Sequence, residues 1–523
     1  MRISLHTCRH WLAKDPVAAV CLALGVFQIY VITWPDPRLI VWPDSIGYLG
    51  PAVDALEGGH FTHWRGRGFV YPLFLLGVLK VAPEPLAIVY AQRLLVVLTY
   101  AALALNVWLL TRFARRTSLA QPSRLTVLAA FWLLTYVTYP PVIGLAHAVM
   151  AESMFSLLLA IVLLCVLLVT LPEVSLTWRR GALAMAAVCN VTLALVKPHW
   201  IGAALLLPLL LIWLVPAGRR LMSVGWVLVP LLLALLAFGI PEKMLQQRYD
   251  AYTSKIFGPR SLFCNSADLI YDDLARDGAD PATEPLRQLL EEIVTPTARA
   301  EARAAGWRQL GFDGDKCMYG AAGKWVAAKY AGDAASEAEY YWQAYLGALL
   351  RKPDYVLSRL GKQLWALAQR PFGKTDVSYP SDSRIVAEYI ELRQFYRTWM
   401  MEYRDDLLGS VESPFGNYQR ELKVLYFLAG ILLLLSVLTA ILRLVFNQSR
   451  APGVTPVSRA FLAVLLLCLA INCLIAVVHT FDVSRYIAMQ VPLFVLLGLL
   501  SSIVIFHRPP VVATSTRRIP ELR

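Results

Sequence analysis

The chain has 523 residues, of which 58% are hydrophobic and only 16% charged, and its mean hydropathy is +0.55. This balance excludes an ordinary soluble enzyme, because several apolar runs reach the roughly 20 residues that a helix needs to cross a bilayer. The net charge of +13 does not indicate nucleic-acid binding, since most basic residues lie in short connections between apolar runs, where they set membrane topology.

The apolar runs predict an all-α polytopic membrane protein. Arg2, Arg9 and Lys14 precede the first run, and no small-residue cleavage site follows, so we expect an uncleaved first span whose amino end is cytoplasmic. The basic connections then orient about ten spans, with both termini inside the cell. The expected spans are residues 16–34, 86–110, 125–140, 149–171, 181–196, 201–215, 221–240, 424–445, 460–478 and 487–506.

This topology divides the chain into three parts. Residues 1–240 form an amino-terminal membrane module with a first outer loop at 35–85. Residues 241–421 form a mainly helical outer domain, and 422–523 form a three-span module with a cytoplasmic tail. Cys264 and Cys317 both lie in the outer domain. An oxidising compartment favours a disulfide between them, and two free buried thiols are an equal alternative.

The first outer loop begins at Trp42-Pro-Asp-Ser-Ile-Gly-Tyr48. Asp44 comes just beyond the first span, and Tyr48 follows one helical turn later on the same face of a short interfacial helix. We expect Gly50-Pro51 to break this helix into two pieces and Gly58-Gly59 to end the second piece.

Ionisable residues gather at the outer end of the predicted bundle, while the membrane midplane is almost wholly apolar. A transporter would keep polar groups near the midplane, so this pattern favours chemistry at the outer interface on a lipid-linked substrate. The outer set comprises Asp44, Arg65, Arg67, His147, Glu152, Lys197, His479, Asp482 and Arg485.

Several members of this set have a purely structural alternative. Asp44 suits a helix N-cap as well as a catalyst, and Arg65 and Arg67 suit contacts with lipid phosphates. Glu152 opens a helix, where the helix dipole favours an acid. Lys197 is harder to explain structurally, because a base at an outer helix end opposes the positive-inside tendency.

The remaining members also have ordinary interpretations. Asp482 and Arg485, three residues apart, can form a local ion pair. His147 and His479 are single histidines that suit packing better than metal binding, because no spacing typical of zinc ligands accompanies them.

The set as a whole suits transfer of a sugar from a polyprenyl phosphate. The departing phosphate gains charge as the glycosidic bond breaks, and Arg and Lys side chains stabilise such charge. A carboxylate near the anomeric carbon can take a proton from the attacking hydroxyl or orient that hydroxyl. One displacement of this kind inverts the sugar and needs a single base.

The order of several short motifs resembles the GT-C membrane glycosyltransferases, especially protein O-mannosyltransferases and bacterial aminoarabinose transferases. The motifs are Asp44 with Tyr48, Gly58-Gly59, Arg65 with Arg67, Tyr71-Pro-Leu-Phe-Leu75, Met150-Ala-Glu-Ser153, Leu195-Val-Lys-Pro198, Leu207-Pro208 and Asp482-Val-Ser-Arg-Tyr486. The resemblance covers the membrane portion, roughly two-thirds of the chain by span placement.

The resemblance implies a GT-C-like bundle and a transferase at the outer face of the cytoplasmic membrane, with a polyprenyl-phosphate sugar as donor. Asp44 matches the family's first-loop catalytic aspartate, and Glu152 matches an acidic position near the site. The other implied residues fall into two groups: donor-phosphate ligands Lys197, Arg485, Arg65 and Arg67, and pocket residues Tyr48, His479, Asp482 and Tyr486.

Two features depart from relatives. Ser45 follows Asp44 where some members carry a second acid, and the outer domain precedes the last three spans instead of ending the chain. The acceptor, whether lipid, glycan or protein, stays open, as does use of a divalent metal. The alternatives are a polymerase or ligase that uses polyprenyl-diphosphate oligosaccharides and a non-enzymatic lipid or glycan exporter.

Overall fold

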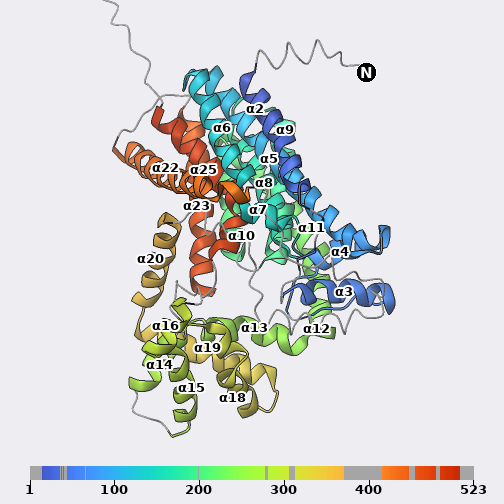
Figure 1. Ribbon diagram of the computed structural model, residues 1–523, viewed down its shortest axis with the longest axis vertical. Coiled ribbons are helices and arrows are strands. Elements are labelled where there is room, and N and C mark those ends of the chain that lie inside the picture. Colours follow the sequence, from blue (N-terminus) through green and yellow to red (C-terminus); the bar gives the residue numbers. More distant parts are fainter. Residues whose placement is uncertain are drawn as a thin grey trace, which may run out of the picture.

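The computed structural model describes residues 15–35, 37, 39–40, 44–64, 66–197, 200–276, 281–304, 312–369, 415–446, 454–478 and 483–506. Within these ranges the secondary structure is helical, apart from one isolated β-bridge between Ile40 and Ala148. The expected all-α architecture is confirmed. Figure 1 shows a helical bundle with a smaller helical body beneath it.

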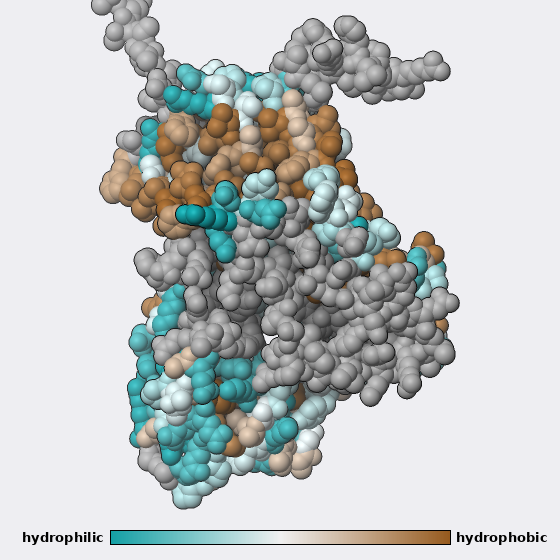
Figure 2. Space-filling view, in the orientation of Figure 1, coloured by the Kyte–Doolittle hydropathy of each residue, from teal (hydrophilic) through white to brown (hydrophobic). Residues whose placement is uncertain are grey.

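The bundle consists of long apolar helices around one continuous buried core. Figure 2 shows an apolar belt on its visible face and a hydrophilic surface over the lower body. The bundle helices are α2 (Pro16–Thr33), α5 (Pro85–Arg116), α6 (Pro122–Thr138), α7 (Pro140–Leu145), α8 (Glu152–Thr170), α9 (Leu176–Val196), α10 (Ile201–Leu214), α11 (Arg220–Ala234), α22 (Gln419–Phe446), α23 (Val454–Val478), α24 (Val483–Ala488) and α25 (Val491–Phe506).

Seven stretches of the described chain, instead of the expected ten or so, are long and apolar enough to cross a membrane. They lie in α2, α5, α8, α9, α22, α23 and the continuous stretch Arg220–Tyr249. The expected spans that fall short each have a proline near one end, and proline cannot donate a helical hydrogen bond. Helix α6 ends at Thr138, shortly before Pro140, the 14-residue α10 ends at Leu214, shortly before Pro216, and Pro492 is the second residue of the 16-residue α25.

Basic side chains gather at the end of the bundle where α5 stops. Arg115 pairs with Asp15 at 3.1 Å, and Arg116 pairs with Glu173 at 2.9 Å, so the end of α5 is tied to the start of α2 and to the turn before α9. The helices of the first outer loop lie at the opposite end (Figure 1). The bundle therefore has a basic end and a loop end.

The first outer loop carries two helices, α3 (Ser45–Glu57) and α4 (Val70–Val81). The expected break at Gly50-Pro51 is wrong, because α3 runs through Pro51. Residues on both sides of the proline, including Leu49 and Val53, are buried, and this burial outweighs the one hydrogen bond that proline removes. The expected end at Gly58-Gly59 is confirmed, with Gly58 as C-cap and Gly59 at φ = 71°.

The lower body has a buried core of its own, built around residues such as Phe263, Leu290 and Tyr341. A π-helical turn, Leu235–Gly239, joins α11 to α12 (Ile240–Tyr249), which leads into this body. Its helices are α13 (Ala251–Cys264), α14 (Ala267–Arg276), α15 (Glu284–Val294), α16 (Pro296–Ala304), α17 (Gly314–Met318), α18 (Ala321–Lys329), α19 (Ala334–Arg351) and α20 (Asp354–Gln369).

Cys264 and Cys317 form a disulfide in this core, with their Cα atoms 5.3 Å apart. Of the two alternatives that the sequence leaves open, the structure therefore has the disulfide. The bond joins the end of α13 to α17. Both helices lie next to the first outer loop.

Candidate active site

Asp44 is positioned by backbone bonds between the first outer loop and the segment before α8. The N–H of Ile40 donates to the carbonyl of His147, and the N–H of Val149 donates back to Ile40, both at 3.0 Å. The Ser45 hydroxyl donates to the carbonyl of Val149, also at 3.0 Å. Ile40 and Ser45, on either side of Asp44, are thereby bound to the segment that ends three residues before the start of α8.

The Asp44 carboxylate pairs with a loop arginine instead of capping α3. Its side chain makes no capping hydrogen bond, although Asp44 occupies the N-cap position. Its Oδ1 accepts from Nη2 of Arg67, and the two side chains are 23% and 22% exposed. The Arg67 guanidinium also lies 5.7 Å from the centroid of the Tyr48 ring. Asp44 and Tyr48 thus share one face, as the sequence predicts.

Lys197 and Glu152 form a second ion pair, and this one is buried. Lys197 is the C-cap of α9 and Glu152 is the first residue of α8, so each charge complements the dipole of its own helix. The Nζ–Oε1 distance is 2.9 Å, and the side chains are only 5% and 0% exposed. The helix-dipole interpretation of Glu152 therefore applies, but the carboxylate also serves as the partner of Lys197.

Tyr48 joins the two ion pairs. Lys197 Nζ donates to the Tyr48 hydroxyl at 3.3 Å and lies 5.8 Å from the ring centroid. Arg67 lies against the same ring. Five residues that the sequence predicts for the site, Asp44, Tyr48, Arg67, Glu152 and Lys197, are therefore together.

A buried layer behind Tyr48 was not predicted from the sequence. The rings of Tyr48 and Tyr71 meet edge to face with centroids 5.1 Å apart. The Gln92 amide donates to the Tyr71 hydroxyl and, at 3.3 Å, to the carbonyl of Met150. All are buried, so the layer fixes the orientation of Tyr48. Tyr71 and Gln92 lie in apolar runs, and their spacing alone carries no signal for a site.

The two glycines that flank Arg67 are required for different reasons, Gly66 by its backbone conformation and Gly68 by close packing. Gly66 has φ = 67°, in the region that favours glycine. A Cβ on Gly68 would lie 1.7 Å from the carbonyl oxygen of Leu195, which is two residues before Lys197. The Gly-Arg-Gly sequence therefore lets the loop lie directly on the end of α9.

Two carboxylates at the ends of α12 hold the same loop from the other side. His63 Nδ1 lies 3.1 Å from Asp250 Oδ2, and Nε2 lies 3.1 Å from Glu242 Oε1. Burial lowers the pKa of His63, but the hydrogen bonds and charges of Asp250 and Glu242 outweigh it and raise that pKa to about 9. The sequence reasoning missed this cluster, because nothing local relates His63 to residues 179 and 187 positions later.

The lower body reaches the site through α13 and α17. Arg67 lies 5.9 Å from the centroid of the Phe257 ring on α13. The exposed Tyr319, just after α17, is close enough for the charges of Arg67 and Asp44 to act on its hydroxyl. The ion pair of Asp44 and Arg67 therefore lies between the bundle and the lower body.

Several predicted residues are not placed with this group. Arg65, His479 and Asp482 lie outside the described residues, as does the side chain of Arg485, although its backbone belongs to α24. Tyr486 is buried in α24. His147 is also buried, with Nε2 3.5 Å from Nη2 of Arg93, which donates to the carbonyl of Pro35 at 2.7 Å. The packing interpretation suits His147.

The described residues offer no group of three His, Cys, Asp or Glu side chains that suits a metal ion. The cluster of His63, Glu242 and Asp250 does not fit one either, because the carboxylates contact different ring nitrogens.

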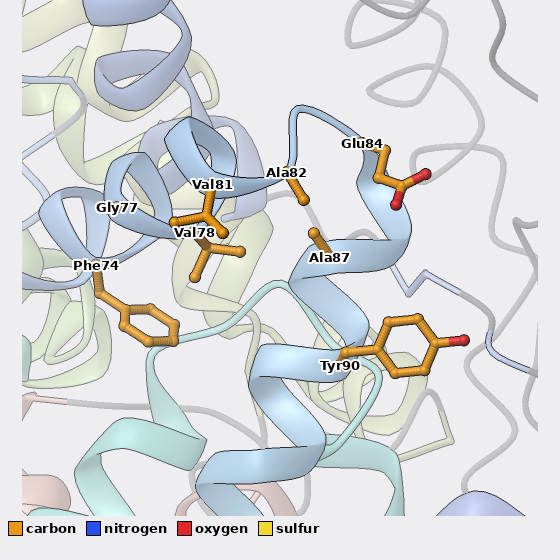
Figure 3. Close-up of a pocket in the computed structure, with 8 residues that line it drawn as sticks. All are labelled: Phe74, Gly77, Val78, Val81, Ala82, Glu84, Ala87 and Tyr90. Atoms are coloured by element: carbon orange, nitrogen blue, oxygen red, sulfur yellow. The ribbon is translucent and has the colours of Figure 1, made fainter.

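An apolar groove of about 620 Å³ lies between α4 and the start of α5 (Figure 3). It is not the site of the ion pairs, but a short series of rings connects them. Phe74 in the groove wall stacks on Tyr71 at 5.9 Å, and Tyr71 contacts Tyr48. The groove is lined by Phe74, Gly77, Val78, Val81, Ala82, Glu84, Ala87 and Tyr90.

Comparisons with known proteins find structural similarity only. No family model matches the chain, and no curated protein matches it. Two crystal structures of ArnT from Cupriavidus metallidurans, one bound to undecaprenyl phosphate and one in the apo state, are 13% and 14% identical to this chain. The alignments cover 94% and 95% of this chain and 78% of each ArnT chain, with a TM-score of 0.33 in both.

Because both TM-scores are below 0.5, the function proposed below rests on this chain's own residues.

Proposed function

We propose that the chain is an inverting membrane glycosyltransferase that moves a sugar from a polyprenyl-phosphate donor to a lipid, glycan or protein acceptor. One observation carries the proposal: two cations, Arg67 and Lys197, and two carboxylates, Asp44 and Glu152, meet around Tyr48 at the loop end of the bundle. Cations suit a departing phosphate, and a carboxylate suits the attacking hydroxyl.

Exposure divides the roles within this group. Asp44 and Arg67 are partly open, so substrate reaches them directly, whereas Lys197 and Glu152 are enclosed. Arg67 binds the donor phosphate, together with Arg65 and Arg485, and Lys197 adds positive potential from behind Tyr48. Asp44, released from Arg67 by the phosphate, becomes available to the acceptor. His479, Asp482 and Tyr486 complete the sugar pocket.

The transfer is a single displacement. The acceptor oxygen forms a bond to the anomeric carbon while the bond from that carbon to the phosphate oxygen breaks. The acceptor proton passes to Asp44, and the electron pair of the broken bond leaves with polyprenyl phosphate, whose charge Arg67 stabilises. No covalent enzyme intermediate is needed.

The apolar groove supports a lipid-linked donor. A hydrocarbon chain in the groove between α4 and α5 lies against Phe74, from which Tyr71 and Tyr48 lead to the cations. Its volume of about 620 Å³ is in the range of small-molecule sites. A polyprenyl tail in this groove and a phosphate at Arg67 are compatible with one bound molecule.

We infer the orientation from charge. The basic end of the bundle carries Arg115, Arg116, Arg180 and Arg220, which suits the cytoplasmic side and supports a position of the loop end at the outer face of the cytoplasmic membrane.

An exporter fits the described bundle less well. Three amides buried within the bundle link neighbouring segments: Asn106 donates to Ala160 in α8, Asn190 to Ala204 in α10, and Asn472 to Gln490 in the turn before α25. Amides engaged in this way serve packing, whereas a transport route needs polar groups that face cargo.

The direct test incubates the purified full-length protein with a panel of polyprenyl-phosphate sugars and follows loss of each donor. Consumption of one donor, with release of polyprenyl phosphate, supports the proposal. Diphosphate-linked oligosaccharides form the second half of the panel, and consumption of these alone would assign the chain to the polymerases and ligases. If no donor is consumed while a labelled lipid crosses proteoliposomes, the exporter replaces the enzyme.

A further inference from the structure

The loop that carries Arg67 is attached to α12 by four contacts to two carboxylates. Asp250 accepts from the N–H of Gly66 at 2.6 Å and contacts His63 Nδ1 at 3.1 Å. Glu242 accepts from the N–H of Phe69 at 2.8 Å and contacts His63 Nε2 at 3.1 Å. Gly66 and Phe69 bracket Arg67, so these contacts determine where the Arg67 backbone lies.

The two ring contacts require a particular protonation state. A neutral imidazole carries one N–H, so one of its nitrogens would present a lone pair to a carboxylate oxygen at 3.1 Å. An imidazolium donates at both nitrogens, and its charge is attracted to both carboxylates. The geometry is therefore that of a charged ring between two acceptors.

From this geometry we propose that His63 is a positioning residue whose imidazolium clamps Glu242 and Asp250 and so holds residues 63–69 on α12, with Arg67 against Asp44. The clamp joins the first outer loop to α12, which continues from α11 of the bundle and leads into the lower body. It is a property of the folded chain and is independent of which sugar or acceptor the site uses.

The charged groups around the ring are consistent with this assignment. Glu242 and Asp250 are the groups whose charges act on His63. Gln246 donates to the same oxygen of Glu242 at 2.6 Å, and Arg67, a cation of the same loop, is engaged with Asp44. One imidazolium thus faces two carboxylates.

The pH dependence follows from the raised pKa of His63. Below about 6.5 the ring is protonated whether or not the loop is docked, so the clamp contributes fully. Between about 6.5 and 9, docking requires uptake of a proton, and above about 9 the contribution is lost. The loop equilibrium is expected to shift toward the undocked state by a factor on the order of one hundred across this window.

The experiment uses the full-length protein in lipid nanodiscs, His63→Gln, and His60→Gln as the matched control, since His60 is an exposed histidine of the same loop. Hydrogen exchange of residues 58–70, corrected for the intrinsic rate at each pH, is followed from pH 6 to pH 10. The wild type and His60→Gln should lose protection progressively between about pH 6.5 and pH 9, by roughly one hundredfold in all. His63→Gln should be unprotected throughout.

A second measurement does not depend on folding of the His63 variant. NMR of ¹³C-labelled histidine should show that the His63 ring stays protonated to about pH 9 in the wild type. Glu242→Gln should lower the pKa of this ring, because the substitution removes one of the two negative charges that face it. A His63 ring that titrates at or below about pH 6.5, or equal loop protection in wild type and His63→Gln at pH 6, would overturn the clamp. No sugar donor is involved, so these outcomes are separate from those of the transferase test.

Discussion

The two ion pairs beside Tyr48 have similar chemistry and opposite surroundings. Lys197 and Glu152 lie at the ends of two packed helices with almost no exposure, whereas Asp44 and Arg67 lie on a loop and are each more than one-fifth exposed. A buried pair is costly to break, because the remaining charge is then unpaired in an apolar environment. A partly exposed pair exchanges partners at little cost, because water solvates both charges. The first pair therefore suits a fixed frame, and the second suits exchange with substrate.

The largest expected effect is on the buried pair. Lys197→Met should lower the free energy of unfolding by about 3–5 kcal/mol, because Glu152 keeps its buried charge without the lysine. Thermal unfolding in detergent measures the change, with the exposed Lys80→Met as control. The double variant Glu152→Met with Lys197→Met should recover most of the loss, since an apolar pair replaces a buried ion pair at low cost. A double variant as unstable as Lys197→Met would argue against direct coupling.

The exposed pair should show the reverse pattern. Asp44→Asn should lower transfer by about 10²–10⁴-fold, the usual contribution of a general base, while changing the free energy of unfolding by less than about 1 kcal/mol. Product formation with the donor identified in the panel and the unfolding midpoint are measured on the same preparation. Glu173→Gln, at the basic end of the bundle, is the matched control. Near-normal transfer by Asp44→Asn would remove this carboxylate from the mechanism.

Arg67 tests whether exchange with substrate occurs. Arg67→Met should weaken binding of polyprenyl phosphate by about tenfold to one hundredfold, the value of a hydrogen bond to a charged group, with little change in unfolding. Binding needs no acceptor, so it is separate from catalysis. Added salt should weaken binding to the wild type more than to Arg67→Met, because an exposed charge is screened. Equal affinity in both proteins would place the phosphate elsewhere.

The same contrast explains which parts of the site the sequence could predict. Asp44, Glu152 and Lys197 stand at the ends of long apolar runs, where a charge is conspicuous, and their meeting at one end of the bundle follows from span alternation. Tyr71 and Gln92 sit inside helices α4 and α5 among apolar neighbours, so only packing reveals that they support Tyr48.

The sequence predicts the helical type of the fold better than the number of helices that are long enough to cross a membrane. Apolar runs predict helices well, because the bilayer permits little else, but their ends depend on prolines and on burial. Pro51 is accepted inside α3 because buried residues lie on both sides, whereas Pro140 and Pro216 mark the ends of α6 and α10. The contact of His63 with Glu242 joins residues 179 positions apart, so no local sequence pattern predicts it.

The smallest effect concerns Tyr48, which touches both pairs. Tyr48→Phe keeps the ring against both cations and removes only the hydroxyl that accepts from Lys197, so it should lower the free energy of unfolding by about 1 kcal/mol and leave binding of polyprenyl phosphate unchanged. Tyr48→Leu removes the ring as well and should weaken both, since Arg67 and Lys197 lose a shared surface. Unfolding and binding measured on both variants separate the hydroxyl from the ring. If Tyr48→Phe weakened binding as much as Tyr48→Leu, the hydroxyl itself would contact the phosphate. Tyr48 would then bind substrate directly, together with Asp44 and Arg67, in addition to packing against the buried pair.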